Sequence, residues 1–565
     1  MPHRTLNGIL ISVVLSAQAT AFTLKMQIHD APLHQIDDRI FGQFMERPTW
    51  GGEMGVEGCL IPGTNRLQPE VVEHLRGMRI PLMRFPGGSS VGYGLHHDWT
   101  VLISNSPSRN TPERPVVHMK EGSDPGTNAF GLDEFIALCR DIKTDPLLCV
   151  HFHEAFDRSR PLKEAALHAA GLVAYCNAPQ GAGLPAGMPD WPAARAKNNH
   201  PEPYGVKYFQ IGNETWFSMD EMIRKGDKEA GKYYVECLAE FVKQMRAVDP
   251  SIEIIADGMP DSLVPMIEDK LGDKIQYLAY HSYRPWGINR ENVLRNGLAF
   301  APEKISKEEG WYAWAATPGF DRETGQAVEH HALYGLARRH GYKIAVTEWN
   351  WNGWWDCEDP PIDSLLAKGI GAAGWLHAFM REGDVVSIAC QSMVAGNAWG
   401  ITAIRADREA KYPAYMLPTG QVTKLYSSHH GKYMVPLHVT GKPYCYEQPY
   451  RMAGIQSHQR VAYVDALATA DDDRIYIHAI NRHYREEVRI DVDLSHFRRL
   501  KGKAVMFALE GDPERNDGDG VHTQAARIRD HALRVRGNRL VASLPRRSVS
   551  VIVLEKAAEA EKPSR

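Results

Sequence analysis

The chain of 565 residues lacks the sequence patterns of several protein classes. Its eight cysteines are scattered without a C-x-x-C pair, which excludes a zinc-ribbon pattern and a dense disulfide framework. No apolar run reaches the roughly 20 residues that a membrane-spanning helix needs. The net charge of -4 gives no reason to expect a nucleic acid or an anionic membrane as partner. Internal repeats and low-complexity tracts are also missing, and the length predicts more than one globular domain.

The first 19 residues have the pattern of a secretory signal peptide. Arg4 precedes a short apolar stretch from Gly8 to Leu15, and Ala17-Gln18-Ala19 fits a cleavage site. We therefore predict cleavage near Ala19 and a secreted or periplasmic protein. One or two disulfides are expected at most in such a compartment, and most of the cysteines are expected to be buried thiols.

Between about residue 36 and residue 404, short apolar runs alternate with helical patterns. Helices are expected over 69–78, 132–142 and 231–248. Strands that alternate with helices in this way predict a (β/α)₈ barrel, which belongs to the α/β class. The predicted strands are 39–44, 81–85, 146–152, 206–211, 252–256, 275–280, 344–347 and 385–390.

The remaining segments predict a second domain and two insertions. Short alternating runs over 405–556 predict a C-terminal β-sandwich, which a strand within 20–35 is expected to join. Residues 557–565 form a charged tail that we expect to be disordered. The insertions 178–203 and 285–330 follow predicted strands, so they are expected to shape a substrate site.

Two glutamates stand at the ends of apolar runs. Glu214 ends the run that begins at Val206, and Glu348 ends the run that begins at Tyr342. The carboxyl ends of the strands form the active-site face of a (β/α)₈ barrel, so both carboxylates are expected in one cleft. A pair of carboxylates there indicates hydrolysis of glycosidic bonds.

Motifs around these glutamates occur in an order that points to one family. They are Phe-Gly-Gln-Phe-Met-Glu at 41–46, Met-Arg-Phe-Pro-Gly-Gly at 83–88, the segment 200–214 that ends in Gly-Asn-Glu, His-Ser-Tyr at 281–283 and Glu-Trp-Asn at 348–350. Together they resemble glycoside hydrolase family 51, whose members are retaining α-L-arabinofuranosidases. The resemblance covers most of the chain after residue 36.

The resemblance implies a double displacement in which Glu348 is the nucleophile and Glu214 the acid/base. Asn213 is expected to bond the 2-hydroxyl of the sugar, and Tyr283 to hold the nucleophile. Neither a metal nor another cofactor is expected, and the resemblance is compatible with a homo-oligomer. Further substrate-binding candidates are Glu46, Arg84, His281, Gln391 and His153.

Several positions depart from the family pattern. Arg47 follows Glu46 where a histidine is usual, Ser89 follows the Gly-Gly turn in place of Asn or Cys, and Thr347 precedes Glu348 in place of an acid. His153 lies where the family has a small polar loop. These changes leave the reaction type intact and leave the sugar open.

The favoured prediction is an exo-acting α-L-arabinofuranosidase that acts on plant polysaccharides or oligosaccharides. Three alternatives to this function remain. The first is another glycosidase of the same clan, such as an endo-glucanase, a β-xylosidase or a galactofuranosidase, for which an open groove lined by Trp311 and Trp314 would be expected. The second is a metallohydrolase, because His151 and His153 beside Glu154 have a spacing that can chelate zinc. The third is a carbohydrate-binding protein without activity.

Overall fold

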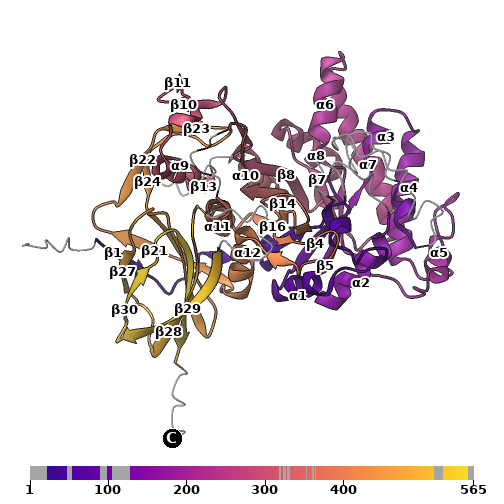
Figure 1. The fold of residues 1–565 in the computed structure, drawn as a ribbon. Helices are drawn as coiled ribbons and strands as arrows, with labels where there is room; N and C mark the ends of the chain where they lie inside the picture. The colour runs from indigo at the N-terminus through magenta and orange to yellow at the C-terminus, as the bar shows by residue number, and fades with distance from the viewer. Residues whose placement is uncertain are drawn as a thin grey trace, which may run out of the picture.

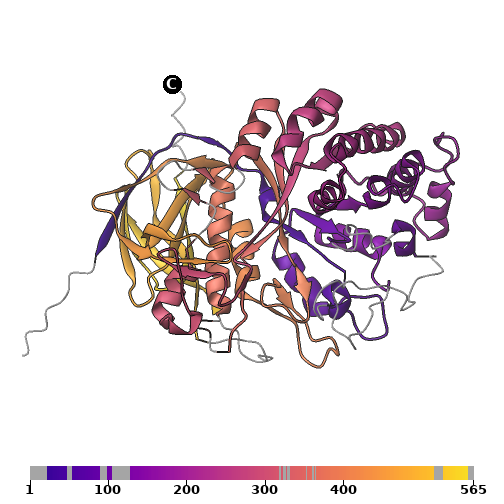
Figure 2. The same cartoon turned by 90° about the horizontal axis from the view of Figure 1, so that it is seen from above.

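The computed structural model describes residues 22–47, 54–88, 98–104, 128–316, 320–321, 326–327, 331–351, 353–358, 360, 362, 364–514 and 526–557. The predicted signal peptide, Ser89 and residues 558–565 of the predicted tail lie outside this part of the chain. Within it, a barrel and a C-terminal sheet domain lie side by side (Figures 1 and 2). None of the helices in the described ranges is long and apolar enough to cross a membrane.

Eight parallel strands close into a barrel in the order β14-β16-β3-β4-β5-β6-β7-β8. This confirms the predicted fold class. Side chains such as Leu82, Ile255 and Ile388 fill the barrel interior. The strands are buried on both faces, which is why they stand out in the sequence as continuous apolar runs. They are β3 (Gly42–Phe44), β4 (Leu82–Phe85), β5 (Asp145–Val150), β6 (Tyr208–Ile211), β7 (Glu253–Asp257), β8 (Tyr277–Arg284), β14 (Lys343–Trp351) and β16 (Val386–Ser392).

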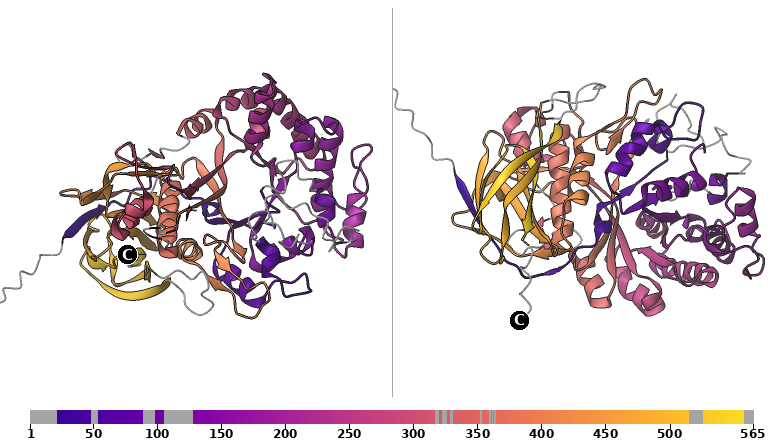
Figure 3. Two further views of the ribbon diagram at one scale, coloured as in Figure 1. Left: turned by 45° about the horizontal axis from the view of Figure 1, so that its top comes forward. Right: turned by 90° about the horizontal axis from the view of Figure 1, so that it is seen from below.

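Helices connect successive strands and pack around the barrel. Figure 3 shows most of them on the side away from the C-terminal sheet, with α11 and α12 between the barrel and that sheet. The helices are α1 (Pro69–Gly77), α2 (Leu132–Ile142), α3 (His153–Phe156), α4 (Leu162–Asn177), α5 (Trp191–Lys197), α6 (Thr215–Arg224), α7 (Ala230–Val248), α8 (Val264–Leu271), α9 (Lys307–Trp314), α10 (His331–His340), α11 (Leu365–Arg381) and α12 (Pro418–Ser428).

The third and seventh strands differ from their predicted bounds in ways that matter for the site. The third was predicted over 146–152, but β5 ends at Val150 and α3 begins at His153. His151 and His153 therefore do not share one face of a strand, because the two-residue period of the strand stops before them. The seventh strand is longer than predicted, so Glu348 lies within β14, at a register shift against β8.

The first predicted strand, 39–44, is divided in two. Residues Asp38–Phe41 form a 3-10 helix, and the Asp37 carboxylate accepts a hydrogen bond from the Arg39 amide at 3.0 Å at its start. Only Gly42–Phe44 remain as β3. The local cap outweighs the apolar character of Ile40 and Phe41, which still pack into the core.

The C-terminal domain is one 11-stranded sheet that folds over on itself. The long strand β29 belongs to both halves, because it pairs with β28 along most of its length and with β30 at its end. The N-terminal strand β1 joins this sheet between β27 and β21. Apolar side chains such as Ile477, Ile490 and Ile552 form the core between the halves. The strands are β1 (Thr23–Ile28), β2 (His34–Gln35), β20 (Tyr433–Val435), β21 (Leu437–Thr440), β25 (Val464–Ala470), β26 (Arg474–Asn481), β27 (Val488–Asp493), β28 (Leu500–Gly511), β29 (Ala526–Arg536), β30 (Arg539–Leu544) and β31 (Ser548–Lys556).

Helix α11 is buried between the barrel and the C-terminal sheet. Small residues let it approach its neighbours closely, and a Cβ atom at Gly371 would overlap the Trp351 indole. On the sheet side, Arg381 donates a hydrogen bond to Asp465 at 2.6 Å. The two domains thus share a packed interface.

Short ladders hold the insertions and connecting loops. All eight cysteines are free thiols, and most are buried. The ladders are β9 (Gly287–Ile288) with β15 (Trp354–Trp355); β10 (Val293–Arg295) with β11 (Leu298–Ala299) and β23 (Tyr450–Met452); β12 (Phe320–Asp321) with β13 (Gln326–Ala327); β17 (Ala395–Gly396) with β18 (Ile404–Arg405) and β19 (Tyr415–Met416); and β22 (Cys445–Gln448) with β24 (His458–Ala462).

Candidate active site

A cleft of about 850 Å³ lies at the carboxyl ends of the barrel strands. Five of the predicted site residues line it, and they come from four different strands or the loops after them: Glu46, Glu214, His281, Tyr283 and Glu348. The other lining residues are Trp216, Phe217, Arg284, Trp286, Gly353, Trp354, Lys368, Ser392, Trp399, Gly400 and Ile401.

Glu214 projects into the cleft from a tight turn between β6 and α6. Gly212 has φ +84°, and a Cβ atom there would lie 2.5 Å from Thr215 Cγ2, so the turn requires glycine. Glu214 itself has φ 50° and ψ 40°, a left-handed conformation that costs a non-glycine residue about 1–3 kcal/mol. The surrounding structure must therefore hold this residue in place.

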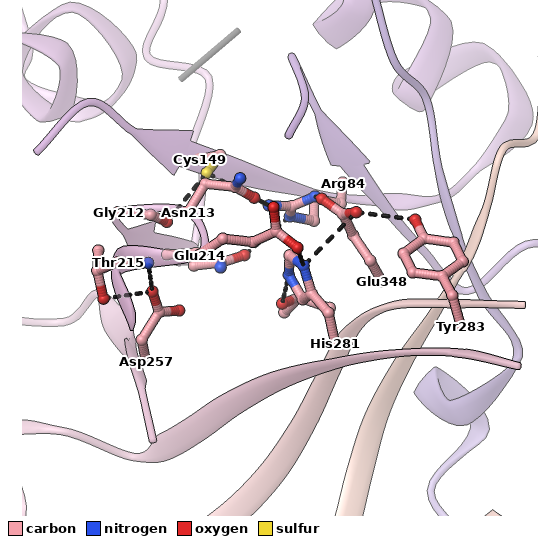
Figure 4. A network of polar contacts seen from close by, with 12 residues as sticks. Arg84, Cys149, Gly212, Asn213, Glu214, Thr215, Asp257, His281, Tyr283 and Glu348 are labelled. Atoms are coloured by element: carbon pink, nitrogen blue, oxygen red, sulfur yellow. Dashed lines mark hydrogen bonds and ion pairs between the residues drawn. The ribbon is translucent and has the colours of Figure 1, made fainter. Parts of the chain in front are cut away.

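Asp257, at the end of β7, holds the residue that follows Glu214. Its Oδ2 accepts hydrogen bonds from the Thr215 amide at 2.8 Å and the Thr215 hydroxyl at 2.7 Å (Figure 4). Burial raises the pKa of Asp257, although both bonds stabilise its ionised form. The carboxylate thus anchors the first turn of α6 and, through it, the backbone of Glu214.

Glu348 is buried among three groups that stabilise its charge. Arg84 Nη1 donates to Oε1 at 2.8 Å, the Tyr283 hydroxyl donates to Oε2 at 2.8 Å, and His281 Nδ1 lies 3.5 Å from Oε2. Burial alone would raise the pKa of Glu348, yet the charges of His281 and Arg84 and these hydrogen bonds lower the pKa below its ordinary value. Glu348 is therefore held as a carboxylate.

Arg84 links the strands beneath the cleft. Besides Glu348, it donates to Gln210 Oε1 at 2.8 Å and to Asn213 Oδ1 at 2.7 Å, and its guanidinium lies 4.6 Å from the centre of the Phe44 ring. Its side chain is fully buried and does not line the cleft. The structure thus makes Arg84 a residue that positions Glu348 and Asn213, whereas a direct bond to the sugar was predicted.

His281 lies between the two glutamates. Its Nδ1 is 3.0 Å from Glu214 Oε1, and its Nε2 is 3.1 Å from Thr347 Oγ1 (Figure 4). The ring also packs edge-on against Trp216, with centroids 5.2 Å apart. One imidazole therefore contacts both carboxylates and has a hydroxyl partner on its far side.

Asn213 and Gly88 complete the floor of the site. Asn213 accepts from Arg84 through Oδ1, and its buried Nδ2 has no hydrogen-bond partner among the described residues. A Cβ atom at Gly88 would lie 2.8 Å from Glu46 Oε1 and 3.0 Å from Glu348 Oε1. The Gly-Gly turn thus leaves space beside both carboxylates, and Asn213 has a donor left for a ligand hydroxyl.

Two further predicted substrate-binding residues, like Arg84 and Asn213, lie outside the cleft lining. Gln391 is fully buried and bonds to Gln43 on β3 and to Thr419 and Thr423 on α12, so its polar atoms are used between the barrel strands and that helix. His153 starts α3, where its Nδ1 lies 3.1 Å from the Ser218 hydroxyl, because β5 ends before it. Neither geometry supports a direct bond to a ligand in the cleft.

The histidines of the metallohydrolase alternative do not converge. His151 lies 3.9 Å from Glu154, whereas His153 lies 3.3 Å from Asp157. Each imidazole therefore has its own acidic neighbour.

The aromatic residues of the cleft differ from those predicted. Trp311 and Trp314 are fully buried in the core, so they form no groove. Trp286 and Trp354 are about half exposed in the cleft instead, with ring centroids 4.9 Å apart. The β9–β15 ladder pairs Trp354 with Gly287 and so brings together two loops that are distant in the sequence. The sequence signal that could have identified Trp354 is the high tryptophan content of residues 349–355.

Comparisons with known proteins point to one family. A family model described as alpha-L-arabinofuranosidase 1 domain matches residues 74–291, and one described as alpha-L-arabinofuranosidase C-terminal domain matches residues 348–548. Alpha-L-arabinofuranosidase C of Emericella nidulans is 23% identical over 86% of this chain and 89% of its own length. Intracellular exo-alpha-(1->5)-L-arabinofuranosidase 1 of Bacillus subtilis is 29% identical over 47% of this chain and 48% of its own length. The crystal structure of the alpha-L-arabinofuranosidase of Thermotoga maritima with arabinose has a TM-score of 0.66 at 21% identity, covering 94% of this chain and 100% of that one, which establishes a shared fold.

The prediction of a secreted or periplasmic protein is contradicted by the relatives. The Bacillus subtilis enzyme and relatives from Acetivibrio thermocellus and Halalkalibacterium halodurans are all named intracellular. The prediction depended on a short apolar stretch within residues 1–19, outside the described part of the chain.

Proposed function

Because the chain belongs to the glycoside hydrolase family 51-like α-L-arabinofuranosidases, we propose that it releases terminal α-L-arabinofuranosyl units from plant-type polysaccharides or oligosaccharides. The observation that supports this most directly is the pair Glu214 and Glu348, whose facing oxygens and His281 Nδ1 all lie within 4.8 Å of one another. Retaining glycosidases hold their carboxyl groups about 5–5.5 Å apart, whereas inverting ones need about 6.5–9.5 Å to fit a water molecule. The short separation therefore favours double displacement.

In the first step, a Glu348 oxygen attacks the anomeric carbon while Glu214 gives its proton to the departing glycosidic oxygen. A glycosyl ester of Glu348 and a free alcohol result. In the second step, Glu214 takes a proton from water, whose oxygen attacks the anomeric carbon and releases Glu348 as a carboxylate. Each proton that Glu214 loses in the first step is thus regained in the second.

The surrounding groups support this chemistry. Arg84 and Tyr283 keep Glu348 ionised and oriented, since burial raises the pKa of Tyr283 so that its hydroxyl stays a donor. Asn213 has its Nδ2 available for the sugar 2-hydroxyl, a bond that strengthens as the transition state forms. Glu46 lies at the floor of the cleft, where it is placed to accept from hydroxyls of the terminal sugar.

The test is a panel of chromogenic glycosides: α-L-arabinofuranoside, β-D-galactofuranoside, β-D-xyloside and β-D-glucoside. We expect cleavage of the arabinofuranoside and its loss in Glu214→Ala and Glu348→Ala. Glu221→Gln is a matched control, because Glu221 is exposed on α6 and pairs with Lys225 in solvent. Activity on another glycoside alone would contradict the proposed sugar, while silence on all four would contradict exo action on small glycosides.

An endo-acting glycanase is the second candidate. The cleft of about 850 Å³ lies near the upper end of the roughly 300–1,000 Å³ typical of small-molecule sites, and Trp286 and Trp354 are exposed in it. Digestion of linear arabinan, xylan and β-glucan separates the two candidates. Exo action yields only monosaccharide at early times, whereas endo action yields a ladder of oligosaccharides.

Replacement of Arg84 by methionine is expected to change both stability and pH dependence. Loss of one partner of a buried ion pair typically lowers the free energy of unfolding by about 3–5 kcal/mol. The pKa of Glu348 should rise without the cation, because a nearby opposite charge favours the ionised form. Since the nucleophile must be ionised, the acidic limb of the kcat/KM profile should move to higher pH.

Urea denaturation and a pH profile on an aryl arabinofuranoside measure the two effects. Arg84→Lys is the control, because it keeps the charge but loses the planar fork that also bonds Gln210 and Asn213. An acidic limb that stays in place in Arg84→Met would contradict the role assigned to Arg84.

Replacement of Asp257 by asparagine is expected to disturb the acid/base residue without touching the substrate. An asparagine cannot accept both Thr215 bonds through an ionised oxygen, so Glu214 should lose its fixed position. A displacement of about 1 Å can cost about 10²-fold in rate. The loss should be larger on an oligosaccharide than on a dinitrophenyl glycoside, whose leaving group needs no proton.

Steady-state kinetics on the two substrates test this prediction. Thr215→Val, which removes only the hydroxyl bond, should show a smaller loss of the same kind. Equal losses on both substrates would indicate general damage to the fold instead of a positioning role.

A further inference from the structure

The three groups around the reaction centre have the spacing of metal ligands. His281 Nδ1 lies 3.0 Å from Glu214 Oε1 and 3.5 Å from Glu348 Oε2 (Figure 4). Zinc binds nitrogen and oxygen at about 2.0–2.2 Å, so two ligands of a tetrahedral zinc site lie about 3.3–3.5 Å apart. The two distances from His281 Nδ1, 3.0 and 3.5 Å, span this ligand-to-ligand distance.

The imidazole also has a partner that suits a metal ligand. His281 Nε2 lies 3.1 Å from the hydroxyl of the fully buried Thr347. A metal ion would displace the proton from Nδ1, and Nε2–H would then donate to that oxygen. Metal-binding histidines usually have such a second partner, which fixes the tautomer and the ring orientation.

We propose that Glu214, His281 and Glu348 form a binding site for one divalent transition-metal ion of the zinc type, and that the ion inhibits the enzyme. The inhibition rests on the proposed function, whereas the binding does not. The ion would bond Glu348 through Oε2, which also accepts from the Tyr283 hydroxyl at 2.8 Å, while the Arg84 bond to Oε1 stays in place. The cleft supplies the open fourth position for water.

The ligand set selects the class of metal. An imidazole with two carboxylates suits zinc and its neighbours, whereas Mg²⁺ and Ca²⁺ prefer shells of six or more oxygens. Arg84 already compensates the charge of Glu348, which leaves less attraction for a hard cation held by charge alone. We therefore expect zinc to bind and magnesium not to bind at the same concentration.

Inhibition follows from the positions of the bonded atoms. Glu348 Oε2 and Glu214 Oε1 both lie within 3.5 Å of His281 Nδ1, and they belong to the two carboxylates of the proposed double displacement. An ion between them would occupy the electron pair of the nucleophile and the site of the proton that Glu214 must deliver. Substrate and ion should therefore exclude each other.

A second group of histidines serves as an internal control. His29 stacks on His496 with ring centroids 3.9 Å apart, and His438 on β21 lies edge-on to His29 at 5.3 Å. Among the described residues, the group with ligand atoms close enough for one ion is Glu214, His281 and Glu348, and these three histidines do not form such a group. We expect no strong zinc site there.

The test is calorimetric titration of zinc chloride into the purified full chain, with magnesium chloride as the comparison. Binding of one zinc ion per chain is expected. Thr347→Val should weaken it by about 10–100-fold, as loss of a ligand's outer partner does. Glu214→Gln should weaken it further, and His438→Ala should leave it unchanged. Thermal melting of each variant checks that the fold is retained.

Two results would overturn the proposal. One is a wild-type titration without one-to-one binding of zinc, and the other is binding that His438→Ala removes while Glu214→Gln leaves it intact. Inhibition is measured separately, as zinc competition with an aryl arabinofuranoside that EDTA reverses. If the enzyme cleaves no arabinofuranoside, the proposed function fails while the titration still decides whether zinc binds.

Discussion

Glu348→Gln is expected to lower kcat for an aryl arabinofuranoside by about 10⁵–10⁶-fold, the scale seen when a catalytic nucleophile is removed. Glutamine matches the shape of the side chain but has no ionised oxygen to form the glycosyl ester. Arg84 would then face a neutral amide at 2.8 Å, so the site also loses its charge balance. Steady-state kinetics measure the loss. The variant must be purified free of wild-type enzyme, because a trace of it would mask so low a rate.

A chemical rescue separates the loss of the nucleophile from a loss of the fold. In Glu348→Ala, azide can occupy the space of the missing carboxylate and attack the anomeric carbon directly. One displacement in place of two should give a glycosyl azide of inverted configuration. Retention of more than a tenth of the wild-type rate in Glu348→Gln would contradict the assignment of Glu348, since replacement of a nucleophile costs far more.

The same variant distinguishes the enzyme from a carbohydrate-binding protein. A binding protein would bind oligosaccharide equally well before and after the substitution and would show no turnover in either form. In the enzyme, Glu348→Gln should still bind arabino-oligosaccharide, because Glu46 and Asn213 remain in place. Loss of turnover with retained binding is therefore the expected signature.

The barrel was predictable from the sequence because its strands are buried on both faces. β16 is buried at every position, and such strands appear as uninterrupted apolar runs between helical patterns. Glu214 and Glu348 were predictable because each follows an apolar run and stands within a family-like motif, and the ends of such runs form the active-site face of a barrel. The structure brings both to one cleft.

Residues beyond the strand ends were less predictable. His153 and Gln391 were predicted to bind substrate from their places near strand ends, but the direction of a side chain there depends on the backbone that follows. α3 begins at His153 and turns it toward Ser218, while Gln391 faces Thr419 on α12, outside the barrel. Trp311 and Trp314 are buried for a similar reason, because α9 packs into the core.

Two of the residues that hold Glu214 and His281 in place had no such role predicted from the sequence. Asp257 and Thr347 are single polar residues at the ends of apolar runs, and their roles exist only through contacts made across the barrel. Asp257 reaches Thr215 from the neighbouring strand, and Thr347 reaches His281. Such contacts depend on the register between strands, which a single sequence does not reveal.

Glu214→Ala is expected to show a loss that depends on the leaving group. On an arabino-oligosaccharide, kcat/KM should fall by about 10²–10⁴-fold, the usual contribution of a general acid. On a 2,4-dinitrophenyl arabinofuranoside it should change by less than about tenfold, because that phenolate departs without a proton. In Glu348→Gln, both substrates should lose activity together.

The second step provides an independent test of the same residue. Without Glu214 to take a proton from water, the glycosyl ester of Glu348 should break down slowly, which produces a burst of dinitrophenolate followed by a slow steady state. Azide needs no general base, so it should speed the steady state and give a glycosyl azide of retained configuration. Equal losses on both substrates, with no burst, would contradict the assignment, because they would mean that Glu214 supports the fold or substrate binding and transfers no proton.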